Sequence, residues 1–160
     1  MKDHSFMKFY QQQPRADPDE GRLFSVAKAD DERHMVFGWA SVAALADGTT
    51  VEDYQRDILE IDELEDAVYD YVLYFRDGGE MHQRRGIGVL VESVVFTPDK
   101  LKAMGIPEGT LPSGWWLGLK ITDDDVWARV KDGTYTMFSI EGEANRTPIE
   151  NAEEDTDEQE

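Results

Sequence analysis

Short apolar runs rich in β-branched and aromatic residues constrain the fold of this chain more than any other feature. Residues 35–43, 86–96 and 115–121 have the length and composition of strands, and turn-forming residues bound them. Helical patterns occur between some of these runs but do not alternate with them regularly, which disfavours a doubly wound parallel sheet. We expect an α+β domain with a small, mainly antiparallel β-barrel flanked by helices.

The strongest helical pattern lies in residues 61–79, where apolar residues recur at helical spacing. Asp62 is its expected N-cap, and Gly78 is its expected left-handed stop. Two shorter helices are expected behind the N-caps Thr97 and Thr122. Helix capping explains the three aspartates after Thr122 better than a metal site does, because negative charge stabilises the start of a helix.

Length and charge indicate one domain with polar ends. The 160 residues suit a flexible N-terminal arm at 1–20, a folded domain at 21–147 and an acidic disordered tail at 148–160. The formal net charge of −19 argues against nucleic acid as a partner. No apolar run is long enough to span a bilayer, and the absence of cysteine excludes disulfides and thiol chemistry.

His82 and Ser139 are the candidate catalytic pair. A serine hydroxyl needs a base to become a nucleophile, and imidazole has a suitable pKa. His82 lies at the end of an element, where its side chain could face a cleft, and Ser139 lies within the last strand run. The alternatives are a half-exposed turn histidine and an edge-strand serine facing water. His4 and His34 are expected to be structural or solvated.

Glu92 is the candidate acid that would orient the imidazole. It interrupts the apolar run "VLVESVVF", and a carboxylate there is costly unless it is paired. Its expected neighbours are Leu90, Val94 and Phe96, on one face of the strand. A structural ion pair to Arg84, Arg85 or Lys120 is the competing interpretation. Ser93 competes with Ser139 as nucleophile but looks buried.

Two further patterns bear on ligands. "GIG" at residues 86–88 lacks the third glycine and the following helix of a dinucleotide-binding loop. We expect neither a metal nor an organic cofactor. Trp115 and Trp116 are expected to serve as core and partner-facing aromatics.

Residues 22–146 resemble the XkdF-like phage serine proteases, relatives of the prohead proteases of tailed phages. The blocks "GGEMHQRRGIGVLVES" and "MFSI" carry the most specific part of the resemblance. It implies a fold similar to the herpesvirus assemblins and places the family's histidine on His82 and its serine on Ser139. Glu92 does not come from the resemblance. The usual "SIGG"-like sequence reads "SIEGEA" here, which departs from the family pattern near the oxyanion site.

The resemblance also implies a biological role. It predicts a capsid-maturation endopeptidase that cleaves scaffold and capsid protein inside the procapsid, in the host cytoplasm or from a prophage, often with self-cleavage. The sequence leaves open whether the chain forms a homo-oligomer. The rival hypotheses are a non-enzymatic head-assembly protein on the same fold and an acidic module that mimics nucleic acid.

Overall fold

The computed structural model describes residues 7–10, 26–52, 58–80, 84–135 and 137–140. Of residues 7–10, 77–80, 84–85, 137 and 139–140 it describes the backbone alone. The N-terminal arm and the acidic tail predicted from the sequence therefore lie mostly outside the described residues, and so does His82.

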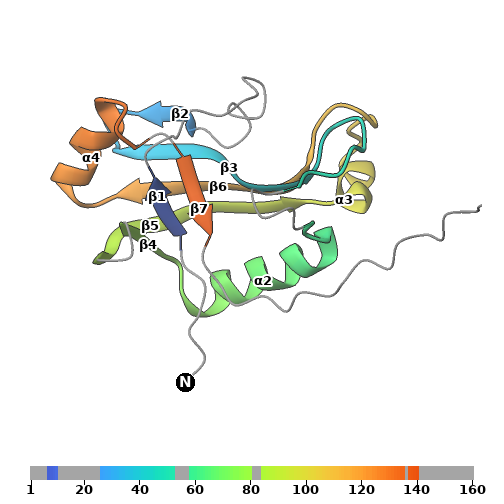
Figure 1. Ribbon diagram of the computed structural model, residues 1–160, viewed down its shortest axis with the longest axis horizontal. Helices are drawn as coiled ribbons and strands as arrows, with labels where there is room; N and C mark the ends of the chain where they lie inside the picture. Colours follow the sequence, from blue (N-terminus) through green and yellow to red (C-terminus); the bar gives the residue numbers. More distant parts are fainter. Residues whose placement is uncertain (1–6, 11–25, 53–57, 81–83, 136, 141–160) are drawn as a thin grey trace, which may run out of the picture.

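Seven strands form one sheet in the order β2-β3-β6-β5-β4-β1-β7 (Figure 1). β2, β3, β6 and β5 make a four-stranded antiparallel sheet, which β4, β1 and β7 extend. β1 runs parallel to β4, and the other pairs are antiparallel. The strands are β1 (Met7–Tyr10), β2 (Val26–Asp30), β3 (Met35–Ala44), β4 (Asp77–Glu80), β5 (Arg84–Phe96), β6 (Ser113–Ile121) and β7 (Met137–Ile140).

The sheet curls over its own core. β1 and β7 cross in front of β3 and β6 in Figure 1, and Cα atoms of β3 and β7 come within 8 Å of each other. The α+β class and the antiparallel sheet predicted from the sequence are confirmed. The barrel is not, because among the described residues no hydrogen-bonded ladder joins the two outermost strands, β2 and β7.

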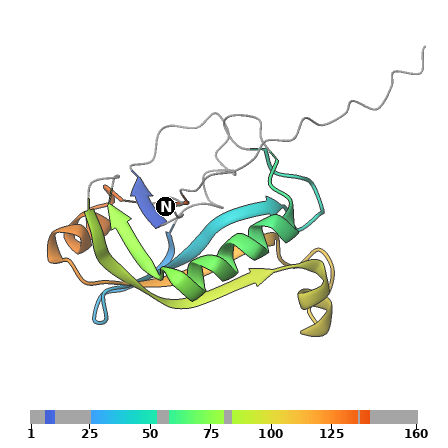
Figure 2. The ribbon, with the colours of Figure 1, turned by 90° about the horizontal axis from the view of Figure 1, so that it is seen from below.

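Three helices complete the described fold. α2 (Ile61–Tyr74) lies along the curved sheet, as the view from below shows (Figure 2). α3 (Pro98–Ala103) directly follows β5, and α4 (Asp124–Lys131) follows β6. None of the helices within the described ranges is long and apolar enough to cross a bilayer.

The hydrophobic core lies between α2 and one face of the sheet, which we call the inner face. In β6 every second side chain, from Trp115 to Ile121, points into this core, as expected for a strand. Other elements close it with Leu64, Val68 and Tyr71 of α2, Val36 and Ala40 of β3, Ile87 and Val95 of β5, Val126 and Trp127 of α4, Tyr135, and Phe138 of β7. The strand that carries Ser139 is therefore anchored through its neighbour Phe138.

Helix ends follow the predicted chemistry at α3 and depart from it elsewhere. The Thr97 hydroxyl accepts a hydrogen bond from the Lys100 amide, as predicted for an N-cap. α4 instead begins behind Asp123, which accepts from the Val126 amide, while Thr122 donates to the Gly86 carbonyl. The expected acidic capping of α4 is confirmed, but the capping residue was predicted one position too early.

The ends of α2 were predicted wrongly. Its N-cap is Glu60, with no side-chain cap, and Asp62 lies inside the first turn. The left-handed residue at its C-terminus is Arg76, with φ 57°, whose amide donates to the Tyr71 carbonyl. Gly78 does not stop the helix, because it already pairs with Met7 and Gly88 in the sheet.

Candidate functional site

Ser139 lies in β7, a strand that hydrogen-bonds to β1. Its backbone is in register with Lys8, and Lys8 is in register with Gly79 of β4. Gly79 in turn pairs with Arg85 of β5. Ser139 thus belongs to a row of paired residues that runs across the sheet through Arg85, Gly79, Lys8 and Ser139. Its strand, β7, lies two strands away from β4.

His82 lies outside the described residues, but both of its flanks are described. Glu80 ends β4, Arg84 begins β5, and these two residues pair with each other. Two strand spacings separate β4 from β7, or about 10 Å. The register therefore brings the backbone of Ser139 and the segments that flank His82 to the same part of the sheet.

Glu92 lies on the opposite face of the sheet, which we call the outer face. Glu92 is exposed and pairs with Gly118 of β6. A Cβ atom added to Gly118 would lie against the Phe37 ring and the Glu92 Cβ, so these two side chains are on the same face as that position. A register shift between Leu90 and Glu92 turns Glu92 outward, whereas Leu90 packs against the core. The prediction that Leu90 and Glu92 share a face is wrong because an alternating pattern does not reveal a bulge.

The described residues do not bring Glu92 to the row of Ser139. Eight residues of β5 separate it from Arg84, about 26 Å for an extended strand. The competing interpretation, an ion pair between Glu92 and Lys120, is not observed, and the Lys120 ammonium donates to the Arg33 carbonyl. Glu92 remains a sequence-based prediction for the orienting acid, and this placement does not favour it.

A depression of about 400 Å³ opens on the outer face beside Glu92. Its lining comes from β2, β3, β5, β6 and the β2–β3 turn, and none of it from a helix: Lys28, Arg33, Met35, Phe37, Val91, Glu92 and Trp116. Arg33 is paired with Asp30, which lowers the pKa of that carboxyl through hydrogen bonds. Lys28 lies over the Phe37 ring, 5.5 Å from its centroid.

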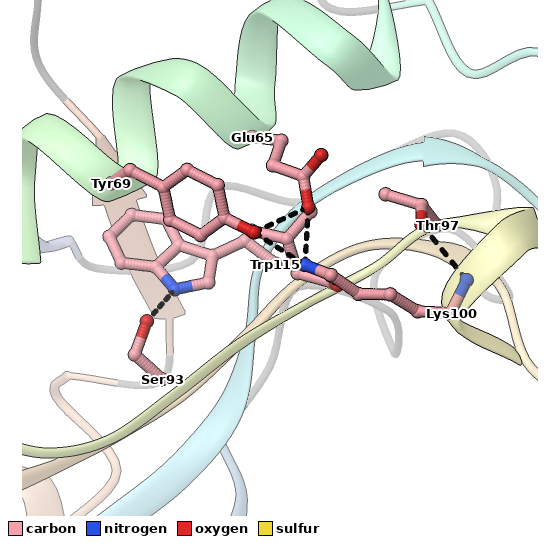
Figure 3. Close-up of polar contacts among 7 residues, drawn as sticks. Glu65, Tyr69, Ser93, Thr97, Lys100 and Trp115 are labelled. Atoms are coloured by element: carbon pink, nitrogen blue, oxygen red, sulfur yellow. Dashed lines mark hydrogen bonds and ion pairs between the residues drawn. The ribbon is translucent and has the colours of Figure 1, made fainter. Parts of the chain in front are cut away.

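Ser93, the competing nucleophile, has a structural role on the inner face. Its hydroxyl accepts a hydrogen bond of 2.9 Å from the Trp115 indole (Figure 3). Trp115 is buried and stacks edge-on against Tyr71 with centroids 5.3 Å apart. A buried indole N–H needs such an acceptor, so this contact explains Ser93 without catalysis.

A polar cluster next to this pair joins α2, α3 and β5. The Lys100 ammonium contacts the Glu65 carboxylate and donates to the Tyr69 hydroxyl at 2.8 Å and the Val95 carbonyl at 3.1 Å (Figure 3). Partial burial alone would lower the pKa of Lys100, but its hydrogen bonds to Glu65 and Tyr69 outweigh that and raise it. Lys100 therefore connects α3 to α2 and to the backbone of β5.

The remaining candidates are structural. His34 occupies the β2–β3 turn with φ 53° and stacks on Trp127 at 4.8 Å, which fits the predicted structural role. Within the described ranges, no three His, Asp or Glu side chains gather as they would around a metal ion. The acidic residues at the start of α4 act as its cap, as predicted.

Sequence reasoning missed β1, the strand that positions Ser139. Met7–Tyr10 lies in the segment predicted as a flexible arm, yet it is inserted between β4 and β7. The available signal was the composition of "MKFY", in which two aromatic residues favour a strand. Four residues next to a polar, proline-broken segment are too few for a strand to be assigned from composition.

Comparison with known proteins identifies relatives for most of the chain. Residues 23–148 match the family described as "Putative phage serine protease XkdF". The chain is also similar to the phage-like element PBSX protein XkdF of Bacillus subtilis (strain 168), with 27% identity over 135 residues. That alignment covers 82% of this chain but 45% of the relative, so the chain spans less than half of that protein's length. No solved structure matches the chain.

Proposed function

The chain belongs to the XkdF family of phage serine proteases, and from this premise we propose that it is a serine endopeptidase with His82 and Ser139 as its catalytic pair. One observation supports the choice of these two residues. The register through β1 places Ser139 two strands from β4, whose end directly precedes the segment containing His82. This pairing supports the choice, because it brings the strand of Ser139 close to the strand that ends two positions before His82.

The proposed chemistry is acyl transfer. His82 takes the proton of the Ser139 hydroxyl as the oxygen attacks the scissile carbonyl, and the resulting imidazolium returns that proton to the leaving amine. Water then attacks the acyl-enzyme, and His82 again acts as base. Backbone amides near Ser139 and Gly142 would stabilise the oxyanion. Neither a metal nor an organic cofactor takes part in this scheme.

The orienting acid is kept separate from this pair. Glu92 was the candidate from the sequence, but it lies eight positions along β5 from Arg84, which pairs with the end of β4, about 26 Å for an extended strand. We therefore restrict the proposal to His82 and Ser139. A Glu92→Gln variant would lose activity by orders of magnitude if Glu92 oriented the imidazole.

We further propose capsid maturation as the biological role. The relative is a protein of the phage-like element PBSX, and the resemblance to prohead proteases implies substrates among the proteins of the phage head. The substrates would be scaffold and capsid proteins inside the procapsid, in the cytoplasm of the host bacterium. Self-cleavage is part of this proposal.

Co-expression with the scaffold and capsid proteins of the same phage-like element tests the proposal. Intact-mass analysis compares the wild type with Ser139→Ala and His82→Ala. Loss of the catalytic serine or its base lowers the rate by at least about 10³-fold, so cleavage products should disappear in both variants. Covalent labelling of Ser139 by a phosphonate probe would identify the nucleophile directly.

Ser93→Ala and His34→Gln are the matched controls. Both residues have structural contacts, to Trp115 and Trp127 respectively, and their replacement should leave the cleavage pattern intact. Circular dichroism verifies that each variant is folded. Cleavage that survives in Ser139→Ala and His82→Ala, or that never occurs with the wild type, would contradict the peptidase and favour a non-enzymatic assembly role.

A further inference from the structure

We propose that the outer face of the four-stranded sheet is a homodimer interface, in which two copies pack sheet against sheet and Lys28 of each copy pairs with Glu92 of the other. This inference does not depend on peptidase activity. It concerns the face of the molecule opposite to α2 and β7, and it names a second copy of this chain as the partner.

The first support is the alignment of the two charges. Lys28 pairs with Phe37, Phe37 with Gly118, and Gly118 with Glu92, so all four residues stand in one row across β2, β3, β6 and β5. Lys28 is at one end of the row and Glu92 at the other, three strand spacings or about 14 Å apart. Among the described residues neither forms an ion pair.

A two-fold axis makes this row self-complementary. If the axis runs parallel to the strands between β3 and β6, it places β2 of one copy over β5 of the other without shifting the row. Lys28 then lies opposite Glu92 twice, once at each edge of the interface. Packed sheets are about 10 Å apart, a distance that a lysine and a glutamate side chain bridge together.

The second support is the apolar surface between the two charges. Trp39 packs against Trp116 and Phe96 with ring centroids 5.6 Å apart in both pairs. Val91 is 43% exposed in the same depression as Trp116, and no residue of the described helices lines that depression. Aromatic residues in such a position are typical of the centre of an interface.

The third support is the local charge. The outer face and the adjacent turn carry three basic residues, Lys28, Arg33 and Lys120, and two acidic ones, Asp30 and Glu92. The whole chain, in contrast, has a net charge of −19. The outer face is therefore not acidic, so the negative charge of the chain does not repel a second copy at this face. Four strands of about nine residues span roughly 19 by 30 Å, so two copies would bury about 1,100 Å² in total, above the lower limit for a specific interface.

Sedimentation equilibrium of the full chain from about 1 µM to about 0.5 mM tests the interface. We expect a monomer–dimer equilibrium with Kd in the micromolar range. Lys28→Glu and Glu92→Lys should each weaken the dimer at least about tenfold, because each places like charges opposite one another. The double variant, which exchanges the two charges, should restore Kd to within about threefold of the wild-type value.

Exposed apolar residues elsewhere provide the control. Leu73 and Tyr74 on α2 are 61% and 71% exposed, and Leu73→Ser and Tyr74→Ser should leave Kd unchanged. Val91→Asp, on the outer face, should weaken the dimer. A wild type that stays monomeric throughout, a dimer insensitive to the single charge reversals, or a folded double variant that does not recover would each overturn the proposal.

Discussion

Trp115 and Trp116 are neighbours in β6, and they show how differently the two faces of this sheet are built. Trp115 is 2% exposed, packs against Tyr71 and donates its indole hydrogen to Ser93. Trp116 is half-buried, meets Trp39 edge-on and lines an open depression. The inner face is sealed by α2 and by the strand of Ser139, so it carries stability and positions the proposed active site. The outer face carries exposed charge and apolar surface, which suit recognition.

The largest expected effect follows from exchanging the two tryptophans for alanine. Trp115→Ala should reduce the free energy of unfolding by about 3–5 kcal/mol, because it empties the core and leaves the Ser93 hydroxyl without its donor. Trp116→Ala should cost about 1–2 kcal/mol, in proportion to its partial burial. Urea denaturation followed by tryptophan fluorescence at about 0.05 µM protein, well below the expected dimer Kd, measures both in the monomer. Equal losses would contradict the division into a sealed and an open face.

Two glycines of β6 sharpen the comparison within the outer face. A Cβ on Gly114 would lie 2.3 Å from the Ser41 carbonyl oxygen, whereas one on Gly118 would lie 2.7 Å from the Phe37 ring. The backbone of β3 cannot move aside as a ring can. Gly114→Ala should therefore destabilise the fold by about 2–3 kcal/mol, and Gly118→Ala by about 1 kcal/mol. Thermal unfolding measures the difference, and the reverse order would show that Phe37 is held rigidly.

The smallest expected effect concerns the polar cluster at the edge of the inner face. Hydrogen bonds from Lys100 and Tyr69 lower the pKa of Glu65. A depressed carboxyl pKa stabilises the fold above the unfolded value of about 4.3, and this contribution is lost as pH falls through the folded value. Glu65→Gln should cost about 0.5–1 kcal/mol at pH 7 and progressively less toward pH 3.

A neighbouring carboxylate on the same helix serves as the control for Glu65. Asp70 is exposed on α2, and no ion pair involves it among the described residues. Denaturant midpoints of wild type, Glu65→Gln and Asp70→Asn are compared from pH 7 to pH 3. The midpoints of Glu65→Gln and wild type should converge in acid. A constant gap would mean that packing, and not charge, explains the effect of Glu65.

Local signals in the sequence predicted most of the described sheet and helices. The runs at 86–96 and 115–121 became β5 and β6, and Thr97 caps α3 as expected. These features depend on residues a few positions apart, so periodicity and capping chemistry reveal them. The bulge before Glu92 is also local, but one inserted residue leaves no mark on an apolar run and turns the subsequent side chains to the other face.

The arrangement of the candidate site depends on pairing that no local pattern contains. His82 and Ser139 could be selected from their chemistry, but nothing near either residue in the sequence indicates that β1 joins β4 to β7. The placement of Glu92 shows the same limit, because the sequence suggested an acid near His82 and the register placed it in another row. Side-chain chemistry identified candidates, whereas their relative positions depend on the register of strands that are distant in the sequence.

The position of β1 has a consequence for how the chain folds during its synthesis. Lys8 and Ser139 are 131 positions apart (139 − 8) yet adjacent in the sheet. Closing so long a loop is entropically costly, and contacts of this separation form late in folding. A ribosome must extend the chain past Ile140 before β7 can pair with β1. The row of strands that contains Ser139 is therefore assembled only after the 131 residues that follow Lys8 have been added.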